Sequence, residues 1–181
     1  MKKTFKKIIK YSFLVLFIFL CTSMFSEDIL PSGYGAVKLG MSIDEAKQLL
    51  SQNPAYGYRG ERDVSLLPGE NRTLISTKGM LFLDESWFQF YNDRLYIITI
   101  NLNTEQIDYY SVFSTLCEKY GQPNSLSPKK SEWKNDSVIM SLEKPLTLKY
   151  TDVKTFEELQ NKSYVRESAE EYNRKNFLDS L

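Results

Sequence analysis

Hydrophobic residues at helical spacing predict a first helix early in the chain. Ser42 and Glu45 have the spacing of a capping box, in which each side chain binds a free backbone amide of the first turn. Asn53-Pro54 then stops the periodic stretch, so we expect the helix over Ile43–Gln52. Its apolar stripe consists of Ala46, Leu49 and Leu50.

A second helix is predicted between residues 107 and 120. Asn103 or Thr104 is its expected N-cap, and Gly121 and Pro123 end it. The apolar residues that follow helical spacing are Ile107, Tyr110, Phe113, Leu116, Cys117 and Tyr120.

Alternating apolar residues predict two β-meanders. In the first, Ser86–Tyr91 and Leu95–Leu102 flank a turn at Asn92-Asp93, after a short strand at Thr73–Thr77. Strict alternation places Tyr96, Ile98, Ile100 and Leu102 on one face of the second run, and Leu95, Ile97, Thr99 and Asn101 on the other. The second meander has strands around Trp133, from Val138 to Leu142, and from Leu146 to Tyr150.

The order of helix, strands, helix, strands and helical tail predicts an α+β fold, with an antiparallel meander sheet and helices packed on one face. Each half passes through a tryptophan (Trp87, Trp133) and an Asn-Asp turn, as two related helix–hairpin halves would. We expect a signal peptide at 1–26, a polar leader at 27–34, the α+β domain at 35–151, and a C-terminal helical extension at 152–181. Val153, Phe156 and Leu159 line a short segment of that tail, and Val165, Ala169 and Tyr172 line a longer one.

The start of the chain has the layout of a secretory signal. Five lysines precede an apolar run of 11 residues, Tyr11 to Cys21, where a membrane-spanning helix needs about 20. Small residues favour a cut after Ser23, with a cut after Ser26 as the alternative. We therefore expect an extracytoplasmic protein, periplasmic or held in the cell envelope.

Cys21 lies where an acylated lipoprotein cysteine would lie. Leu20 directly before it does not fit the small residues of a lipobox, so we favour cleavage over lipidation at Cys21. Retention of residues 1–26 as a tether is a third alternative. Contact with a membrane is expected only through such a tether or a lipid.

Charge and composition exclude several classes of function. The chain has 23 basic and 23 acidic residues, and five of the lysines lie in the first 26 residues, so the mature part has five more acidic than basic residues. An acidic domain does not attract nucleic acid. The absence of histidine removes Ser-His-Asp catalysis and His-based metal sites. A single mature cysteine, Cys117, removes an intramolecular disulfide and thiolate zinc sites. We expect no cofactor and no metal.

The stretch Val37-Lys38-Leu39-Gly40-Met41-Ser42 and the helix ending Tyr120-Gly121-Gln122-Pro123 resemble small bacterial envelope domains. These are the outer-membrane-assembly lipoproteins of the SmpA/OmlA type and the repeats of the β-lactamase inhibitor protein. The resemblance implies a capped helix followed by a three-stranded antiparallel sheet, and a non-catalytic protein that binds other proteins through its sheet and loops. It carries over no binding residue.

Aromatic and arginine side chains are the candidate binding residues. Tyr and Arg are enriched at the energetic centres of protein interfaces, and a glycine-containing loop gathers Tyr56, Tyr58, Arg59 and Arg62. Trp87 and Tyr91 share one face of a strand whose other face carries Phe88 and Phe90. The competing interpretation is that the tyrosines cover the edge of the sheet and that the 55–83 segment or the tail covers Trp87.

Two hypotheses of function follow. The first is a non-enzymatic module that binds an envelope protein through the open face of the sheet or the 56–63 loop. The alternative is a carboxylate- and tyrosine-based binder or hydrolase of cell-wall glycans, which would use Glu61 with Asp63, or Asp84 with Glu85.

Overall fold

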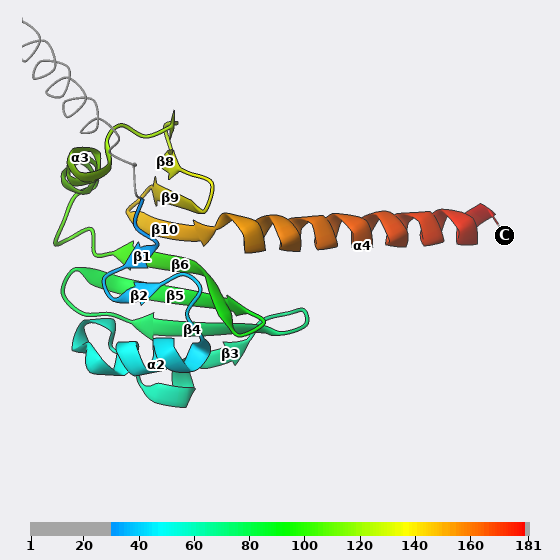
Figure 1. Ribbon diagram of the computed structural model, residues 1–181, viewed down its shortest axis with the longest axis horizontal. Coiled ribbons are helices and arrows are strands. Elements are labelled where there is room, and N and C mark those ends of the chain that lie inside the picture. Colours follow the sequence, from blue (N-terminus) through cyan, green and yellow to red (C-terminus); the bar gives the residue numbers. More distant parts are fainter. Residues whose placement is uncertain (1–29, 180–181) are drawn as a thin grey trace, which may run out of the picture.

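The computed structural model describes residues 30–179, and Figure 1 shows their arrangement. The predicted signal segment, both cut sites and Cys21 lie outside the described residues. The helices are α2 (Ile43–Gln52), α3 (Tyr109–Tyr120) and α4 (Val153–Asp179), with 3-10 turns η1 (Pro54–Tyr56) and η2 (Gly60–Asp63). The strands are β1 (Gly33–Tyr34), β2 (Val37–Lys38), β3 (Val64–Leu66), β4 (Arg72–Lys78), β5 (Leu83–Tyr91), β6 (Arg94–Leu102), β7 (Ser125–Leu126), β8 (Lys130–Lys134), β9 (Val138–Glu143) and β10 (Thr147–Asp152).

Eight strands form one antiparallel sheet in the order β3-β4-β5-β6-β10-β9-β8-β7. The order divides into two halves, each a helix followed by four strands: α2 with β3 to β6, and α3 with β7 to β10. The last strands of the two halves, β6 and β10, pair at the centre of the sheet. The predicted α+β meander fold is therefore confirmed, and its two halves are arranged about a pseudo-twofold axis between β6 and β10.

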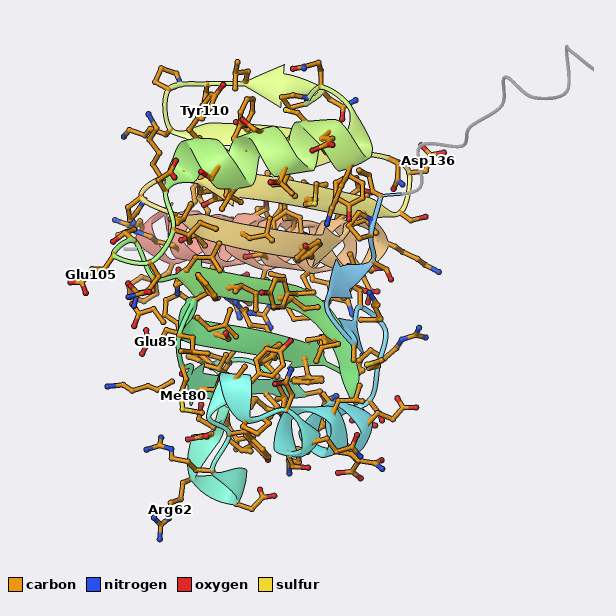
Figure 2. All side chains as sticks on the ribbon, turned by 90° about the vertical axis from the view of Figure 1, so that its left-hand side faces the viewer. Arg62, Met80, Glu85, Glu105, Tyr110 and Asp136 are labelled. Carbon is orange, nitrogen blue, oxygen red and sulfur yellow. The ribbon has the colours of Figure 1, made fainter. Side chains whose placement is uncertain are left out.

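Helices α2 and α3 and the small β1–β2 sheet cover the same face of the large sheet, as Figure 2 shows. The main hydrophobic core lies between these layers. Its largest fully buried side chains include Trp133, Phe88, Phe90, Leu50, Ile75, Leu95, Ile98, Ile100, Met140 and Leu142. The opposite face of the sheet is left without a helical layer except where α4 begins.

Helix α2 has the predicted bounds, and its start is held by two loops. Ser42 and Glu45 form the predicted capping box, and the hydrogen bonds from the backbone and hydroxyl of Ser42 lower the pKa of the Glu45 carboxyl. Asp93 also reaches across from the β5–β6 turn and accepts a hydrogen bond from the Ile43 amide at 2.9 Å. The helix start is therefore tied to the neighbouring hairpin.

The predicted N-cap of the second helix is wrong. Helix α3 begins at Tyr109 and is capped by Asp108, which accepts hydrogen bonds from the amide and hydroxyl of Ser111. The Asn103 side chain instead accepts from the Glu105 amide, and the Asn103 carbonyl accepts from residues 106 and 107. Asn103 thus forms a separate turn before the helix.

The face assignment in β6 is also partly wrong, because the strand contains a β-bulge. Gln89 pairs with Ile97, but the next residue, Phe90, pairs with Leu95, so Tyr96 is inserted between the two pairs. Tyr96 and Ile97 consequently pack together on the face away from α2, while Leu95 belongs to the main core.

The start of the domain differs from the predicted boundary, and the C-terminal helix begins where it was predicted. Leu30 is buried in the core and β1 pairs with β2, so the described part of the leader, residues 30–34, belongs to the folded domain. At the other end, α4 is one continuous helix where two segments were predicted. Its first turns pack on Tyr96 and Ile97 through Phe156 and Leu159. Every described side chain from residue 160 to 178 is exposed, and the helix projects away from the sheet (Figure 1).

Within the described residues, no helix combines the length and the apolar character that a membrane span requires.

Candidate functional site

The structure uses the predicted 56–63 loop mainly for internal contacts. Tyr56 is only 3% exposed, and its ring packs edge-on against Phe88 and Tyr34. Burial raises the pKa of the Tyr56 phenol to about 12. Tyr58 is half-buried against the same core. Tyr56 is therefore a residue of the main core, packed on the interior strand β5, and neither a free binding residue nor a cover for the edge of the sheet.

The charged residues of this loop are largely paired with each other or with α2. Asp63 is buried and accepts hydrogen bonds from the Arg59 amide at 2.7 Å and the Arg59 Nε at 2.9 Å. Glu61 binds the Lys47 ammonium at 2.7 Å. The predicted pair Glu61 and Asp63 thus consists of two carboxylates held by separate cations. Arg62 is exposed and points away from the domain in Figure 2.

Trp87 and Tyr91 lie on the opposite face of the sheet from the α2 layer, so the six predicted binding residues do not form one surface. Tyr91 is covered by α4: Lys162 lies over its ring, 5.2 Å from the centroid, and donates a hydrogen bond to its hydroxyl at 2.8 Å. Lys162 makes these contacts with Tyr91 and not with Trp87, which is 36% exposed. Of the two alternatives for this strand, coverage by the tail applies to Tyr91 and exposure to Trp87.

Trp87 lies in a row of side chains that crosses the uncovered face, which we call the open face. The strand register aligns one residue from each of the six strands β4-β5-β6-β10-β9-β8. In this order the residues are Ser76, Trp87, Thr99, Lys149, Ser141 and Glu132. Thr99 and Ser141 are small and buried, at 7% and 4% exposure. The larger side chains of Trp87, Lys149 and Glu132 beside them are more accessible to solvent. The open face is therefore a polar surface with one exposed indole.

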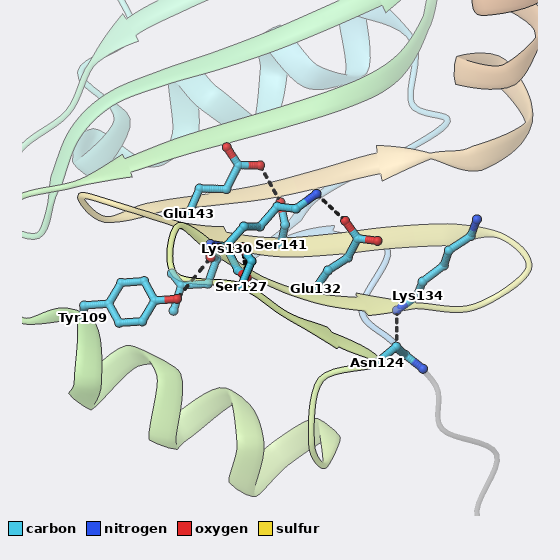
Figure 3. Close-up of polar contacts among 9 residues, drawn as sticks. Tyr109, Asn124, Ser127, Lys130, Glu132, Lys134, Ser141 and Glu143 are labelled. Carbon is cyan, nitrogen blue, oxygen red and sulfur yellow. Dashed lines mark hydrogen bonds and ion pairs between the residues drawn. The ribbon is translucent and has the colours of Figure 1, made fainter.

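Polar side chains on the β8–β10 part of the open face are joined by hydrogen bonds (Figure 3). Lys130 binds Glu132 at 2.6 Å, and the Ser141 hydroxyl donates to Glu143 at 2.9 Å. Helix α3 lies on the other side of these strands, where the Tyr109 and Ser131 hydroxyls are 3.0 Å apart. These contacts fix the orientation of the polar side chains before any ligand binds.

The described residues offer little for metal or covalent chemistry. No group of three or more Cys, Asp or Glu side chains in residues 30–179 is arranged to hold a metal ion. Burial raises the pKa of the Cys117 thiol, which disfavours the reactive thiolate. Asp84 and Glu85 line a cavity of about 540 Å³ at one end of the sheet, together with Asn101, Glu105 and Thr147.

Sequence reasoning identified Trp87 but missed the residues that surround it. Lys149 stands between the buried Leu148 and Tyr150, so the alternation of β10 already contained the signal that it faces away from the core. The partners across the row could not be found in the same way, because the pairing of β6 with β10 joins residues about 50 positions apart.

The comparisons with known proteins agree with these domain limits. A family model described as the TP0088 domain matches residues 32–162, which include the whole sheet, α2, α3 and the first turns of α4. Searches of curated proteins and of solved structures found no match. The matched segment ends at Lys162, the residue that contacts Tyr91, and the exposed part of α4 follows it. Because the match covers most of its length, the chain belongs to the TP0088 domain family.

Proposed function

We propose that the protein is an exported, non-catalytic module that binds another protein of the cell envelope through the open face of its sheet. The observation that carries this proposal is Trp87, an indole 36% exposed on β5, on the sheet face that α2 and α3 leave uncovered. Tryptophan is among the residues most enriched at the energetic centres of interfaces.

The surroundings of Trp87 support binding to a protein surface. Its cross-strand neighbours Ser76 and Thr99 are small, so a partner side chain can approach the indole from above. Lys149 and the Lys130–Glu132 pair supply polar groups around it, as at the rim of an interface. The SmpA/OmlA and β-lactamase-inhibitor resemblance implies three antiparallel strands after each capped helix, whereas each half of this chain has four. Kinship with that class is part of the proposal.

A photo-crosslinking experiment tests the open face. A photoreactive phenylalanine is placed at position 87 or 149 of the full chain in its own cells, and at position 110 as the control. Tyr110 is 75% exposed on α3, which covers the other face. We expect one envelope protein to crosslink from 87 and 149 but not from 110. Equal crosslinking from all three positions would refute the open face as the binding site.

The purified partner then measures the contribution of the indole. We expect Trp87→Ala to weaken binding by about 30-fold, which corresponds to about 2 kcal/mol, the threshold of a hot spot. Tyr110→Ala should leave the affinity within twofold. An unchanged affinity for Trp87→Ala would contradict the proposal.

The glycan hypothesis predicts a different result. If the protein binds or hydrolyses cell-wall glycan fragments, and replacement of Glu61, Asp63, Asp84 and Glu85 by amides abolishes this, the alternative function holds. The intact mass of the protein recovered from cells decides among cleavage after Ser23, cleavage after Ser26, a lipid on Cys21 and retention of the first 26 residues.

A further inference from the structure

The loop between β4 and β5 exposes three consecutive large apolar side chains. Met80, Leu81 and Phe82 are 50%, 77% and 54% exposed. Scattered single apolar residues are normal on a protein surface, whereas a contiguous group of this kind marks an interaction site. We call these three residues the apolar loop.

Backbone hydrogen bonds fix the apolar loop in this exposed arrangement. The Met80 amide donates to the Ala55 carbonyl at 2.9 Å, and the Leu83 amide donates to the Met80 carbonyl at 3.1 Å. The Phe82 carbonyl accepts from the Asn103 amide at 2.9 Å. The side chains therefore cannot turn inward unless the connections to η1 and to the β6–α3 segment are broken.

The backbone conformation of Leu81 is also energetically unfavourable. Its φ is +60°, in the left-handed region that a branched, non-glycine residue seldom adopts. Strained backbone of this kind persists where the surroundings enforce it, and it clusters at functional sites. Neither glycine nor asparagine occupies the position; a large apolar residue does. A function that requires an exposed apolar side chain at position 81 explains why leucine occurs there.

The cavity next to the apolar loop is lined by acidic side chains, and Lys78 lies opposite Glu85 in the β4–β5 ladder. The cavity of about 540 Å³ is lined by Asp84, Glu85 and Glu105, and by Asn103, whose amide binds Phe82. No lysine or arginine lines it, and within residues 30–179 none of the three carboxylates forms an ion pair. In Figure 2 the labelled Met80, Glu85 and Glu105 follow one another along the same edge.

We propose that the apolar loop and this acidic cavity form a docking surface for a protein segment that carries aliphatic or aromatic residues next to lysine or arginine. The apolar loop provides the buried contact, and the unpaired carboxylates attract the flanking cations. The same carboxylates repel an anionic bilayer. This surface is independent of Trp87, so either proposal can fail alone.

A peptide library tests the chemistry of the occupant. Random 12-residue peptides displayed on phage are selected on the purified protein, and each enriched peptide is measured by fluorescence anisotropy at two salt concentrations. We expect the enriched peptides to combine two or more large apolar residues with lysine or arginine, and to bind more weakly at high salt. Failure to enrich any peptide, or enrichment of acidic peptides, would overturn the proposal.

Variants locate the binding. The double substitution Leu81→Asn and Phe82→Ser keeps a residue that tolerates positive φ at position 81 and removes the apolar contact; it should weaken peptide binding at least tenfold. Glu85→Gln with Glu105→Gln should abolish most of the salt dependence. Leu126→Ser is the matched control, because Leu126 is 69% exposed on β7 away from the cavity. Circular dichroism and the urea midpoint verify that each variant folds.

Two further outcomes would assign the apolar loop to another occupant. Sedimentation with phosphatidylglycerol vesicles that depends on Leu81 and Phe82 would make it a membrane contact. A dimer in analytical ultracentrifugation that dissociates in the double variant would make the occupant a second copy of the chain. Either result would overturn the proposal of a basic, apolar protein segment.

Discussion

Asp93 connects the β5–β6 turn to the start of α2 through a hydrogen bond. The structure allows the loss of stability on its replacement to be predicted. Asp93 lies with Asn92 in the two-residue turn between β5 and β6, and both residues have positive φ, 48° and 59°. This is the mirror-image turn that matches the twist of a hairpin, in which Asn and Asp are favoured. The Asp93 carboxylate also accepts the Ile43 amide at 2.9 Å.

Three substitutions of Asp93 separate these contributions. Asp93→Asn keeps an acceptor and loses the negative charge near the helix N-terminus, so we expect a loss of about 0.5 kcal/mol. Asp93→Gly keeps the positive φ and removes the acceptor, which should cost about 1 kcal/mol, as for the loss of a helix cap. Asp93→Ala removes the acceptor and adds left-handed strain of roughly 1 kcal/mol, so we expect about 2 kcal/mol in all.

Urea unfolding followed by circular dichroism measures these differences in the free energy of unfolding. The slope of that free energy against urea should be the same in all variants, because the folded structure is unchanged. Asn92→Gly serves as the control for the turn: it keeps the Ile43 contact and removes only the exposed hydrogen bond from the Asn71 side chain at 2.9 Å, so we expect a loss of about 0.5–1 kcal/mol. Equal stability of the Gly and Ala variants would refute strain at position 93. A Gly variant as stable as the wild type would refute the contribution of the Ile43 contact.

Two more replacements probe the core. Burial raises the pKa of the Tyr56 phenol from 10.0 to about 12, so the neutral phenol stabilises the fold fully below pH 10, and this contribution is lost as the pH rises towards 12. Tyr56→Phe should therefore lose about 1.4 kcal/mol less than the wild type between pH 9 and pH 11 in urea titrations, and parallel losses would contradict this. Trp133 is 1% exposed and its indole N–H donates to the Gly121 carbonyl at 2.9 Å; Trp133→Phe should cost about 2–3 kcal/mol. The same variant leaves the exposed Trp87 as the single tryptophan, so its fluorescence emission should shift to longer wavelength, and a blue emission maximum would show that Trp87 is buried.

Local signals in the sequence were sufficient for the regular elements. Ser42 and Glu45 specify the start of α2 through contacts within one helical turn, and Pro54 specifies its end, so the predicted bounds are those observed. Asn92-Asp93 likewise defines its turn without help from distant residues. These features could be predicted because their free energies arise between neighbours in the chain.

The errors arose where a distant part of the chain decides the local structure. Alternation alone placed Tyr96 on the same face as Ile98 and Ile100, but the bulge turns it towards Phe156 and Leu159 of α4, about 60 residues later. Asn103 has the right residue type for a cap. Its backbone N–H, however, donates a hydrogen bond to the Phe82 carbonyl, and its side-chain oxygen accepts one from the Glu105 backbone N–H in a separate turn. No pattern within either segment indicates these partners.

The candidate sites divide in the same manner. Trp87 was predicted because its face follows from alternation within one strand, and Tyr56 lies in the core because the η1 turn folds it over Phe88. The apolar loop was not predicted at all. Apolar residues beside Gly79 are expected to be buried, and the backbone hydrogen bonds of the loop with Ala55, Leu83 and Asn103 hold them outward.

The two-half architecture explains why α2 and α3 both leave the same face of the sheet uncovered. The sequence evidence for two halves used the tryptophans, but Trp87 lies on the third strand of its half and Trp133 on the second, so they are not equivalent positions. The equivalence lies in the topology, in which each half packs its helix on the same face and contributes its last strand, β6 or β10, to the central pair. The axis that relates the two halves lies between β6 and β10 and is perpendicular to the sheet. A rotation about this axis does not exchange the two faces of the sheet. Helices α2 and α3 must therefore lie on the same face, and neither covers the opposite one. The row from Ser76 through Trp87 and Lys149 to Glu132 therefore crosses from one half to the other. A partner bound on Trp87 would contact both halves, and neither half alone would present the complete surface.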